Sequence, residues 1–289
     1  MSAVGRNATH LSEKHPLAIF DENLRFVEDG HAYYVRNGNA FLRHRGHSVT
    51  GILKKVFPRE PFDKGATFTK YQASWRKDET SKYHTAVAGK SDEEARASVF
   101  KMFDDARDLG TLLHLVIELY LNKVPKEKVP EEIATEFQHF LNWMEDNPNL
   151  EPFRTELGVL AKNDQGTVVM VGQADAVFLD KTTNKYVLVD FKRTDKDLTQ
   201  SAPNYRKYGV DVMQGVPFNP FFEYSLQAWL YASMLQKSTE LEVSHCLLLQ
   251  LFPTFPNYKV ITCKHFQDHA EMILWPEPKK KKRERSEEA

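Results

Sequence analysis

Two aspartates and one lysine, Asp175, Asp190 and Lys192, stand at related positions in two β-rich runs. The runs cover residues 168–179 and 185–192, and the residues between them are polar and turn-like. This pattern predicts a β-hairpin. The second run is continuously apolar over residues 186–189, as expected of a central strand that is buried on both faces. Such a strand should not carry charge, yet this one leads directly into Asp190.

Folding this hairpin about its midpoint places Asp175 opposite Asp190, and Lys192 points to the same side as Asp190. Directly opposed residues have Cβ atoms about 4.5–5.5 Å apart. Two carboxylates at this separation repel, which raises the pKa of one of them. A divalent cation removes the conflict, and oxygen ligands suit Mg²⁺ or Mn²⁺. The alternative is a surface hairpin whose charges at residues 190 and 192 are solvated.

Further candidate ligands come from segments distant in sequence. His114 and Glu118 lie four residues apart in the apolar run 112–121, so a helix there places both on one face. A lone histidine on an apolar helix is more often a core residue than a ligand, but glutamate is rarely buried without a partner. Glu156, in a predicted strand over residues 153–161, supplies a third acid near the hairpin.

Bulk composition limits the classes of protein to be considered. The 289 residues are 41% hydrophobic and 27% charged, with a net charge of −1. No global basic field points to nucleic acid, so any such surface must be local. The two cysteines cannot supply the four thiolates of an iron–sulfur cluster and indicate a reducing compartment. No secretory signal is evident and no run approaches 18 apolar residues, so we expect neither secretion nor membrane insertion.

The remaining elements are predicted from periodicity and turn signals. Residues 24–35 read as a hairpin, and Ser48 is expected to cap a helix that ends before Pro58. A helix from residue 91 to about 109 is expected to stop at Gly110-Thr111 and to resume over 112–121. Further helices are predicted over 131–144 and 221–236, and further strands over 244–252 and 258–263.

Three polar segments are candidates for nucleic-acid contact. The cluster of Arg43, His44, Arg45 and His47 suits phosphate, or is a solvated loop. The long segment 195–220 interleaves bases, including Arg206 and Lys207, with aromatic residues, as in surfaces that bind a nucleic-acid strand. An ordinary solvated loop explains that segment equally well. In the helix that follows, Gln227 and Tyr231 lie four residues apart on one face.

The C-terminal end carries a dense basic run followed by acidic residues. Such a run on a flexible tail is typical of a nuclear import signal, or of a solvated or nonspecific nucleic-acid-binding tail. We expect a nuclear location, mediated by an import receptor, or a cytoplasmic one if the tail has no such role. The residues assigned to the signal are Lys279, Lys280, Lys281, Lys282 and Arg283.

Taken in order, these residues resemble the PD-(D/E)XK nuclease superfamily, and within it the RecB-type exonuclease branch. That branch includes the mitochondrial genome maintenance exonucleases, the CRISPR adaptation nucleases and viral and phage relatives. Its pattern is a helical His, a Glu, Gly-x-x-Asp, Asp-x-Lys and Gln-x-x-x-Tyr. The corresponding residues are His114; Glu156; Gly172-Gln173-Ala174-Asp175; Asp190-Phe191-Lys192; and Gln227-Ala228-Trp229-Leu230-Tyr231. Ala174 replaces the proline of the superfamily's name, which this branch commonly tolerates.

The resemblance implies roles for these residues. Asp175, Asp190 and His114 would bind Mg²⁺ or Mn²⁺, with the backbone carbonyl of Phe191 completing the shell. Lys192 would orient the attacking water, or help to deprotonate it, and stabilise charge on the phosphate. Glu156 would hold a water or a second metal, and no iron–sulfur cluster is expected. The residues assigned to substrate binding are Gln227, Tyr231, Arg193, Arg206 and Lys207. Glu118 lies outside the family pattern and is given a supporting role behind the ligands.

The sequence thus predicts an α/β fold, with a mixed central β-sheet flanked by helices and a restriction-endonuclease-like nuclease core. A disordered tail is expected over 1–17 and a flexible one over 276–289. The single domain between them divides into an N-terminal hairpin and helical part (18–109) and a catalytic core (110–275). The expected function is hydrolysis of DNA, at single strands or duplex ends, in repair, recombination or replication. The alternatives are a catalytically silent nucleic-acid-binding or assembly module of the same fold and a metal-dependent nucleotide phosphohydrolase.

Overall fold

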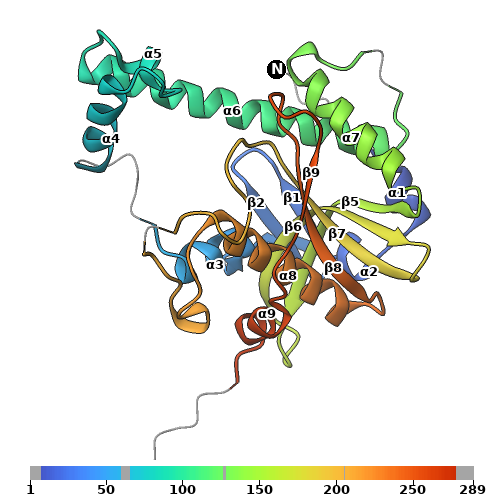
Figure 1. The fold of residues 1–289 in the computed structure, drawn as a ribbon. Coiled ribbons are helices and arrows are strands. Elements are labelled where there is room, and N and C mark those ends of the chain that lie inside the picture. Colours follow the sequence, from blue (N-terminus) through green and yellow to red (C-terminus); the bar gives the residue numbers. More distant parts are fainter. Residues whose placement is uncertain (1–7, 60–65, 126–127, 205, 278–289) are drawn as a thin grey trace, which may run out of the picture.

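A computed structural model describes residues 8–59, 66–125, 128–204 and 206–277. A mixed six-stranded sheet lies at its centre (Figure 1). Strand β5 pairs along one edge of β6. Both β4 and β7 pair with the opposite edge of β6, and β8 and β9 follow β7 in the sheet. Pairing is antiparallel for β5–β6, β6–β7 and β8–β9 and parallel for β4–β6 and β7–β8. The strands are β4 (His47–Ser48), β5 (Leu150–Lys162), β6 (Val168–Asp180), β7 (Lys185–Lys192), β8 (Val243–Gln250) and β9 (Lys259–Thr262).

Helices cover both faces of this sheet. Because side chains alternate along a strand, Leu188 and Leu248 join one apolar cluster with α3 (Val49–Val56) and α8 (Pro220–Ser238). Val189 and Leu249 join a second cluster with the C-terminal half of α6 (Asp92–Leu121) and with α7 (Ala134–Asp146). In Figure 1, α6 and α7 lie on the opposite side of the sheet from α3, α8 and α9 (Gln267–Leu274). The prediction of a mixed sheet flanked by helices, with β7 buried on both faces, is confirmed.

The hairpin of β6 and β7 has the predicted register. Its pairs run from Asp180–Lys185 to Ala176–Val189, so the next pair in line is Asp175 with Asp190. Asp180 holds the turn, because its carboxylate accepts hydrogen bonds from the Thr182 amide and from two side chains, at 2.9 Å each. These bonds hold the pKa of Asp180 down at about 2.

Strand β6 loses its β7 partner at the position of the candidate site. Strand β5 pairs along one edge of β6 from Val168 to Asp180. On the other edge, β7 pairs with Ala176 to Asp180, whereas β4 pairs with Met170 and Val171. Asp175 therefore stands where two neighbours of β6 separate, which leaves space for side chains from the helices.

The predicted interruption of the central helix is wrong. Helix α6 runs without a break from Asp92 to Leu121, and Ser91 and Glu94 form a capping box at its start. Gly110 lies within it. A single glycine costs a helix only about 1 kcal/mol relative to alanine, which the packing of the apolar face on either side of Gly110 outweighs.

The N-terminal part contains the predicted hairpin within a three-stranded antiparallel sheet. Its strands are β1 (Leu24–Val27), β2 (Ala32–Asn37) and β3 (Ala40–Arg43). The predicted cap of α3 is confirmed, since the Ser48 side chain accepts a hydrogen bond from the Gly51 amide at 3.1 Å. Helix α2 (Ala18–Asp21) precedes β1.

The disorder expected over residues 1–17 is wrong for residues 8–17. Helix α1 (His10–Lys14) packs on the core through Leu11, whose side chain is buried and whose amide donates to the Asn122 side chain at 3.0 Å. That contact joins segments more than a hundred positions apart, so local sequence could not reveal it. Residues 1–7 lie outside the described part of the chain.

A small helical unit stands at the far end of α6 from the sheet (Figure 1). It consists of α4 (Ala66–Lys77), α5 (His84–Val87) and the first turns of α6, around a separate cluster that includes Phe68 and Val99. The other predicted elements are confirmed with shifted ends, and residues 131–146 form the 3₁₀ turn η1 (Glu131–Ile133) followed by α7. The turn η2 (Asp211–Met213) interrupts the long segment before α8. The predicted import signal, residues 279–283, lies outside the described residues.

Candidate metal centre

Three side chains from three elements converge where β6 parts from β7. His114 comes from α6, Glu156 from β5 and Asp175 from β6, and one donor atom of each lies within 4.8 Å of the other two. All three side chains are partly buried. One imidazole nitrogen and two carboxylates form a mixed donor set, which suits a divalent cation such as Mn²⁺ or Mg²⁺.

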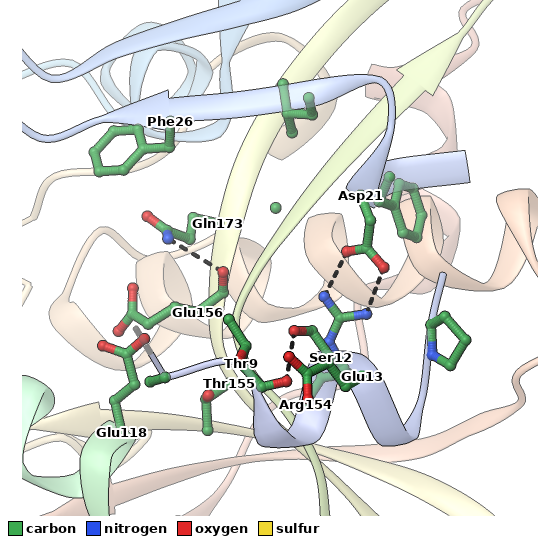
Figure 2. Close-up of a pocket in the computed structure, with 15 residues that line it drawn as sticks. Thr9, Ser12, Glu13, Asp21, Phe26, Glu118, Arg154, Thr155, Glu156 and Gln173 are labelled. Carbon is green, nitrogen blue, oxygen red and sulfur yellow. Dashed lines mark hydrogen bonds and ion pairs between the residues drawn. The ribbon is translucent and has the colours of Figure 1, made fainter. Parts of the chain in front are cut away.

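An unusual backbone conformation accompanies Glu156. Its neighbours Thr155 and Leu157 pair with Ala176 and Ala174, so Glu156 stands opposite Asp175. Its φ is +45°, in the left-handed region that non-glycine residues rarely adopt. Such strain costs on the order of 1–3 kcal/mol and persists only when surrounding contacts impose it. The side chain of Gln173 donates to the Glu156 carbonyl at 3.2 Å (Figure 2), which is one such contact.

His114 is oriented by the backbone of β7. Its Nε2 lies 3.0 Å from the Phe191 carbonyl oxygen, and its Nδ1 lies 3.6 Å from Asp175 Oδ2. The same carboxylate oxygen accepts the Phe191 N–H at 2.9 Å. In the neutral tautomer protonated at Nε2, the Nδ1 lone pair faces a carboxylate oxygen. Two acceptors facing each other are an arrangement that a cation between them stabilises, and metal-binding histidines commonly donate their other N–H to a carbonyl.

Asp190 and Lys192 form a buried ion pair beside these three residues. Asp190 is 3% exposed, and its Oδ2 lies 2.5 Å from Lys192 Nζ. Burial raises the pKa of Asp190 to about 6, against the opposing effect of Lys192. The pKa of Lys192 is raised although burial lowers it, because Asp190 and Asp175 favour the cation. The sequence analysis assigned relief of the repulsion between the two aspartates to a divalent cation. In the structure, the ammonium group of Lys192 also offsets this repulsion.

One residue of α8, Tyr224, contacts this ion pair. The ring of Tyr224 lies 4.4 Å from Lys192 Nζ, in a cation–π contact. Sequence reasoning did not assign Tyr224 to the site, although it lies on the same face of the helix as Gln227. Gln227 donates from Nε2 to the hydroxyl of buried Tyr231 at 3.2 Å. Burial raises the pKa of Tyr231 well above its ordinary value, so its hydroxyl stays protonated.

Gly172 has a steric role in the Gly-x-x-Asp segment. A Cβ at this position would lie 2.5 Å from Cε1 of Tyr231 and 3.0 Å from Cγ2 of Val49. Only glycine lets α8 bring Tyr231 this close to β6. The glycine thus positions the tyrosine, and it lies three residues before Asp175 on the same strand.

A cavity of about 560 Å³ adjoins the Glu156 side of the centre. Glu118, one helical turn after His114, lines it and is buried. Figure 2 shows the side chains of Glu118 and Glu156 approaching each other at one wall, and Arg154 with Asp21 at another. Arg154 donates two hydrogen bonds to the Asp21 carboxylate, at 2.6 and 3.0 Å.

The other predicted site residues are placed as follows. Arg193 is held by Glu136 of α7, with 2.7 Å between Nε and Oε1, and sequence reasoning did not find this partner. Arg206 and Lys207 are exposed in the segment before α8. Asp190 lies beside the three converging donors without being one of them, and the Phe191 carbonyl faces His114. The ligand roles of these two and the substrate roles of the three basic residues remain predictions.

Comparisons with known proteins identify no family. No protein-family model matches the chain, and no curated protein matches it. Among solved structures, one described as the crystal structure of SSO0001 matches with 13% identity and a TM-score of 0.34, covering 81% of this chain and 76% of that one. A similarity this distant carries no argument about function. Within the described residues, no helix has both the length and the apolar character needed to cross a membrane.

Proposed function

We propose that the protein is a metal-dependent deoxyribonuclease of the PD-(D/E)XK type, resembling the RecB-type exonucleases and acting on single strands or duplex ends. The observation that carries this proposal is the convergence of His114, Glu156 and Asp175 next to the buried Asp190–Lys192 pair. The fit to a divalent cation rests on the convergence of one imidazole and two carboxylates and on these donor types. A role in DNA repair, recombination or replication follows from the same resemblance.

In this mechanism the chain's own residues orient the phosphate and stabilise its charge. A divalent cation held by His114, Glu156 and Asp175 would lower the pKa of a water and polarise a phosphoryl oxygen. Lys192 stays protonated beside Asp190, so it acts as a hydrogen-bond donor and positive charge toward the phosphate rather than as a neutral base. Tyr224 and Asp190 hold that ammonium group in place. The Asp-x-Lys segment therefore supplies charge, and the resemblance implies that Gln227 and Tyr231 would position Lys192 or the DNA backbone.

The test is cleavage of end-labelled single-stranded DNA, duplex DNA and RNA, and of free nucleotides, with Mn²⁺, Mg²⁺ or EDTA. We expect DNA cleavage with either metal, none in EDTA, and loss of cleavage in Asp175→Asn. The matched control is Asp268→Asn, at an exposed position in the first turn of α9, which should cleave as the natural protein does. Turnover of nucleotides without cleavage of nucleic acid would instead identify a phosphohydrolase, and binding of DNA without cleavage would identify a silent module.

We also propose nuclear import through the basic run at residues 279–283, which is supported by its sequence alone. The test is the distribution of a fluorescent fusion with and without residues 278–289. A fusion that stays nuclear when the run is removed would refute an import role.

A further inference from the structure

We propose that a groove near the candidate metal centre binds the phosphodiester backbone of a nucleic-acid strand. The rise along β6 places the two at most about 23 Å apart. The groove lies between the N-terminal sheet and the turn joining β5 to β6, with a volume of about 440 Å³. Three arginines, one lysine and one histidine line it, and no acidic residue is among its described lining. Burial lowers the pKa of the histidine, so the positive charge comes from the other four. The basic residues, named here the basic groove, are Arg36, Arg43, His44, Arg45 and Lys162.

Both walls of the basic groove are held by backbone contacts. On one wall, the amide of Arg36 donates to the Asn23 carbonyl at 2.9 Å, and that of His44 donates to the Tyr33 carbonyl at 2.7 Å. On the other wall, the Asn163 side chain accepts the amides of Gln165 and Thr167, at 3.1 and 2.9 Å. Fixed walls with basic side chains at their rim suit a ligand whose charge repeats along its length.

The concentration of charge is local. The whole chain has a net charge of −1, so the basic groove stands out from a nearly neutral average. Arg43 and Arg45 are exposed. Arg36 also contacts Glu22 at 3.5 Å, an exposed pair of the kind that contributes little. Arginine forks match phosphate oxygens, and such contacts supply most of the sequence-independent affinity for nucleic acid.

Strand β6 links the basic groove to the candidate centre. Val168, the first residue of β6, lines the groove, and Asp175 lies seven positions further along. At about 3.3 Å per residue, the two are at most about 23 Å apart. Strand β4, which follows the arginines, pairs with Met170 and Val171 between them. If the proposed nuclease function holds, one substrate strand several nucleotides long reaches both sites, and this step alone depends on that function.

The test measures binding without cleavage. A fluorescent single-stranded oligonucleotide long enough to span both sites is titrated in EDTA at several salt concentrations. Each phosphate contact contributes about 0.7 to the slope of log K against log salt for a single strand. The double variant Arg43→Gln/Arg45→Gln should therefore reduce the slope by about 1.4 and weaken binding about 25-fold at 0.1 M salt.

The matched control removes the same charge elsewhere. In Lys101→Gln/Arg107→Gln, both residues lie on the exposed face of α6 and pair with Asp104, Asp105 and Asp108. We expect this variant to bind as the natural protein does. Lys162→Gln, on the opposite wall, should reduce the slope by about 0.7. If circular dichroism shows that the double arginine variant is unfolded, this single variant provides the test of binding at the basic groove.

The outcomes separate this inference from the proposed function. Loss of binding in the groove variants, in a protein that never cleaves DNA, would refute the nuclease and leave the basic groove supported. The proposed binding of nucleic acid at the basic groove would be overturned if the natural protein cleaves DNA and the groove variants bind as tightly, and with the same salt slope, as the control. Absence of any oligonucleotide binding in EDTA would overturn it as well.

Discussion

Replacing Lys192 with methionine should destabilise the protein in a way that grows with pH. The substitution removes the cation 2.5 Å from the buried carboxylate of Asp190 and keeps most of the side chain's volume. In the natural protein the pKa of Asp190 is raised to about 6. Without Lys192 that pKa must rise further, because burial and Asp175 then act with no opposing cation at close range.

The sign follows from proton linkage. An unfolded aspartate has a pKa of about 3.9, so a raised folded pKa penalises the folded state as pH rises from 3.9 to that pKa. Well below pH 6, Asp190 is protonated in both folded proteins and the penalty is the same. Above pH 6 it stops growing in the natural protein and continues in Lys192→Met, at about 1.4 kcal/mol per pH unit. The difference between the two proteins therefore grows as pH rises above 6, by on the order of 1 kcal/mol per pH unit until the pKa of Asp190 in the variant is reached.

The assay is urea unfolding in EDTA at pH 6, 7 and 8, with the double variant Asp190→Asn/Lys192→Met completing the cycle. The double variant lacks the titrating acid, so this extra pH dependence should disappear from it. Lys185→Met is the matched control, because Lys185 pairs with Glu242 at the surface, where the loss should be about 1 kcal/mol or less and independent of pH in this range. A constant difference between Lys192→Met and the natural protein from pH 6 to pH 8 would refute the pairing.

Four further predictions concern strand β6, helix α6, the turn between β6 and β7, and the metal. Gly172→Ala should lower the free energy of unfolding by about 1–3 kcal/mol, because the added methyl group would lie 2.5 Å from the Tyr231 ring. Gly110→Ala, inside α6, should raise the free energy of unfolding by about 0.5–1 kcal/mol, because its Cβ would meet no atom within 4 Å. Both are measured by urea titration. Asp180→Asn should lower the melting temperature at pH 7, because the ionised acid with its depressed pKa stabilises the fold above about pH 4. The difference in melting temperature from the natural protein should shrink as pH falls toward 2. A difference unchanged at pH 2 would show that the Asp180 carboxylate does not stabilise the turn. His114→Ala should lose the rise in melting temperature that Mn²⁺ gives the natural protein, and an undiminished rise would exclude this residue as a ligand.

Local pattern was sufficient for the hairpin that carries the site. The alternation and length of the apolar runs, with a polar turn between them, predicted β6, β7 and their register as far as the Ala176–Val189 pair. Turn and cap chemistry acts over a few residues, so the Ser48 cap and the β1–β2 hairpin were also predictable. The same local reasoning failed at Gly110, where a break expected from one residue was overruled by packing along the helix.

Only the tertiary structure decided how the candidate residues meet. His114 and the Phe191 backbone are separated by 77 positions, and no periodicity relates them. The left-handed φ of Glu156 and the fit of Tyr231 against Gly172 depend on contacts from other elements. The sequence determined which strands form and which donor types they carry, because secondary structure follows short-range periodicity and turns. Packing determined which carboxylate lies with His114 and which pairs with Lys192, because side chains distant in sequence become neighbours only when the helices cover the sheet.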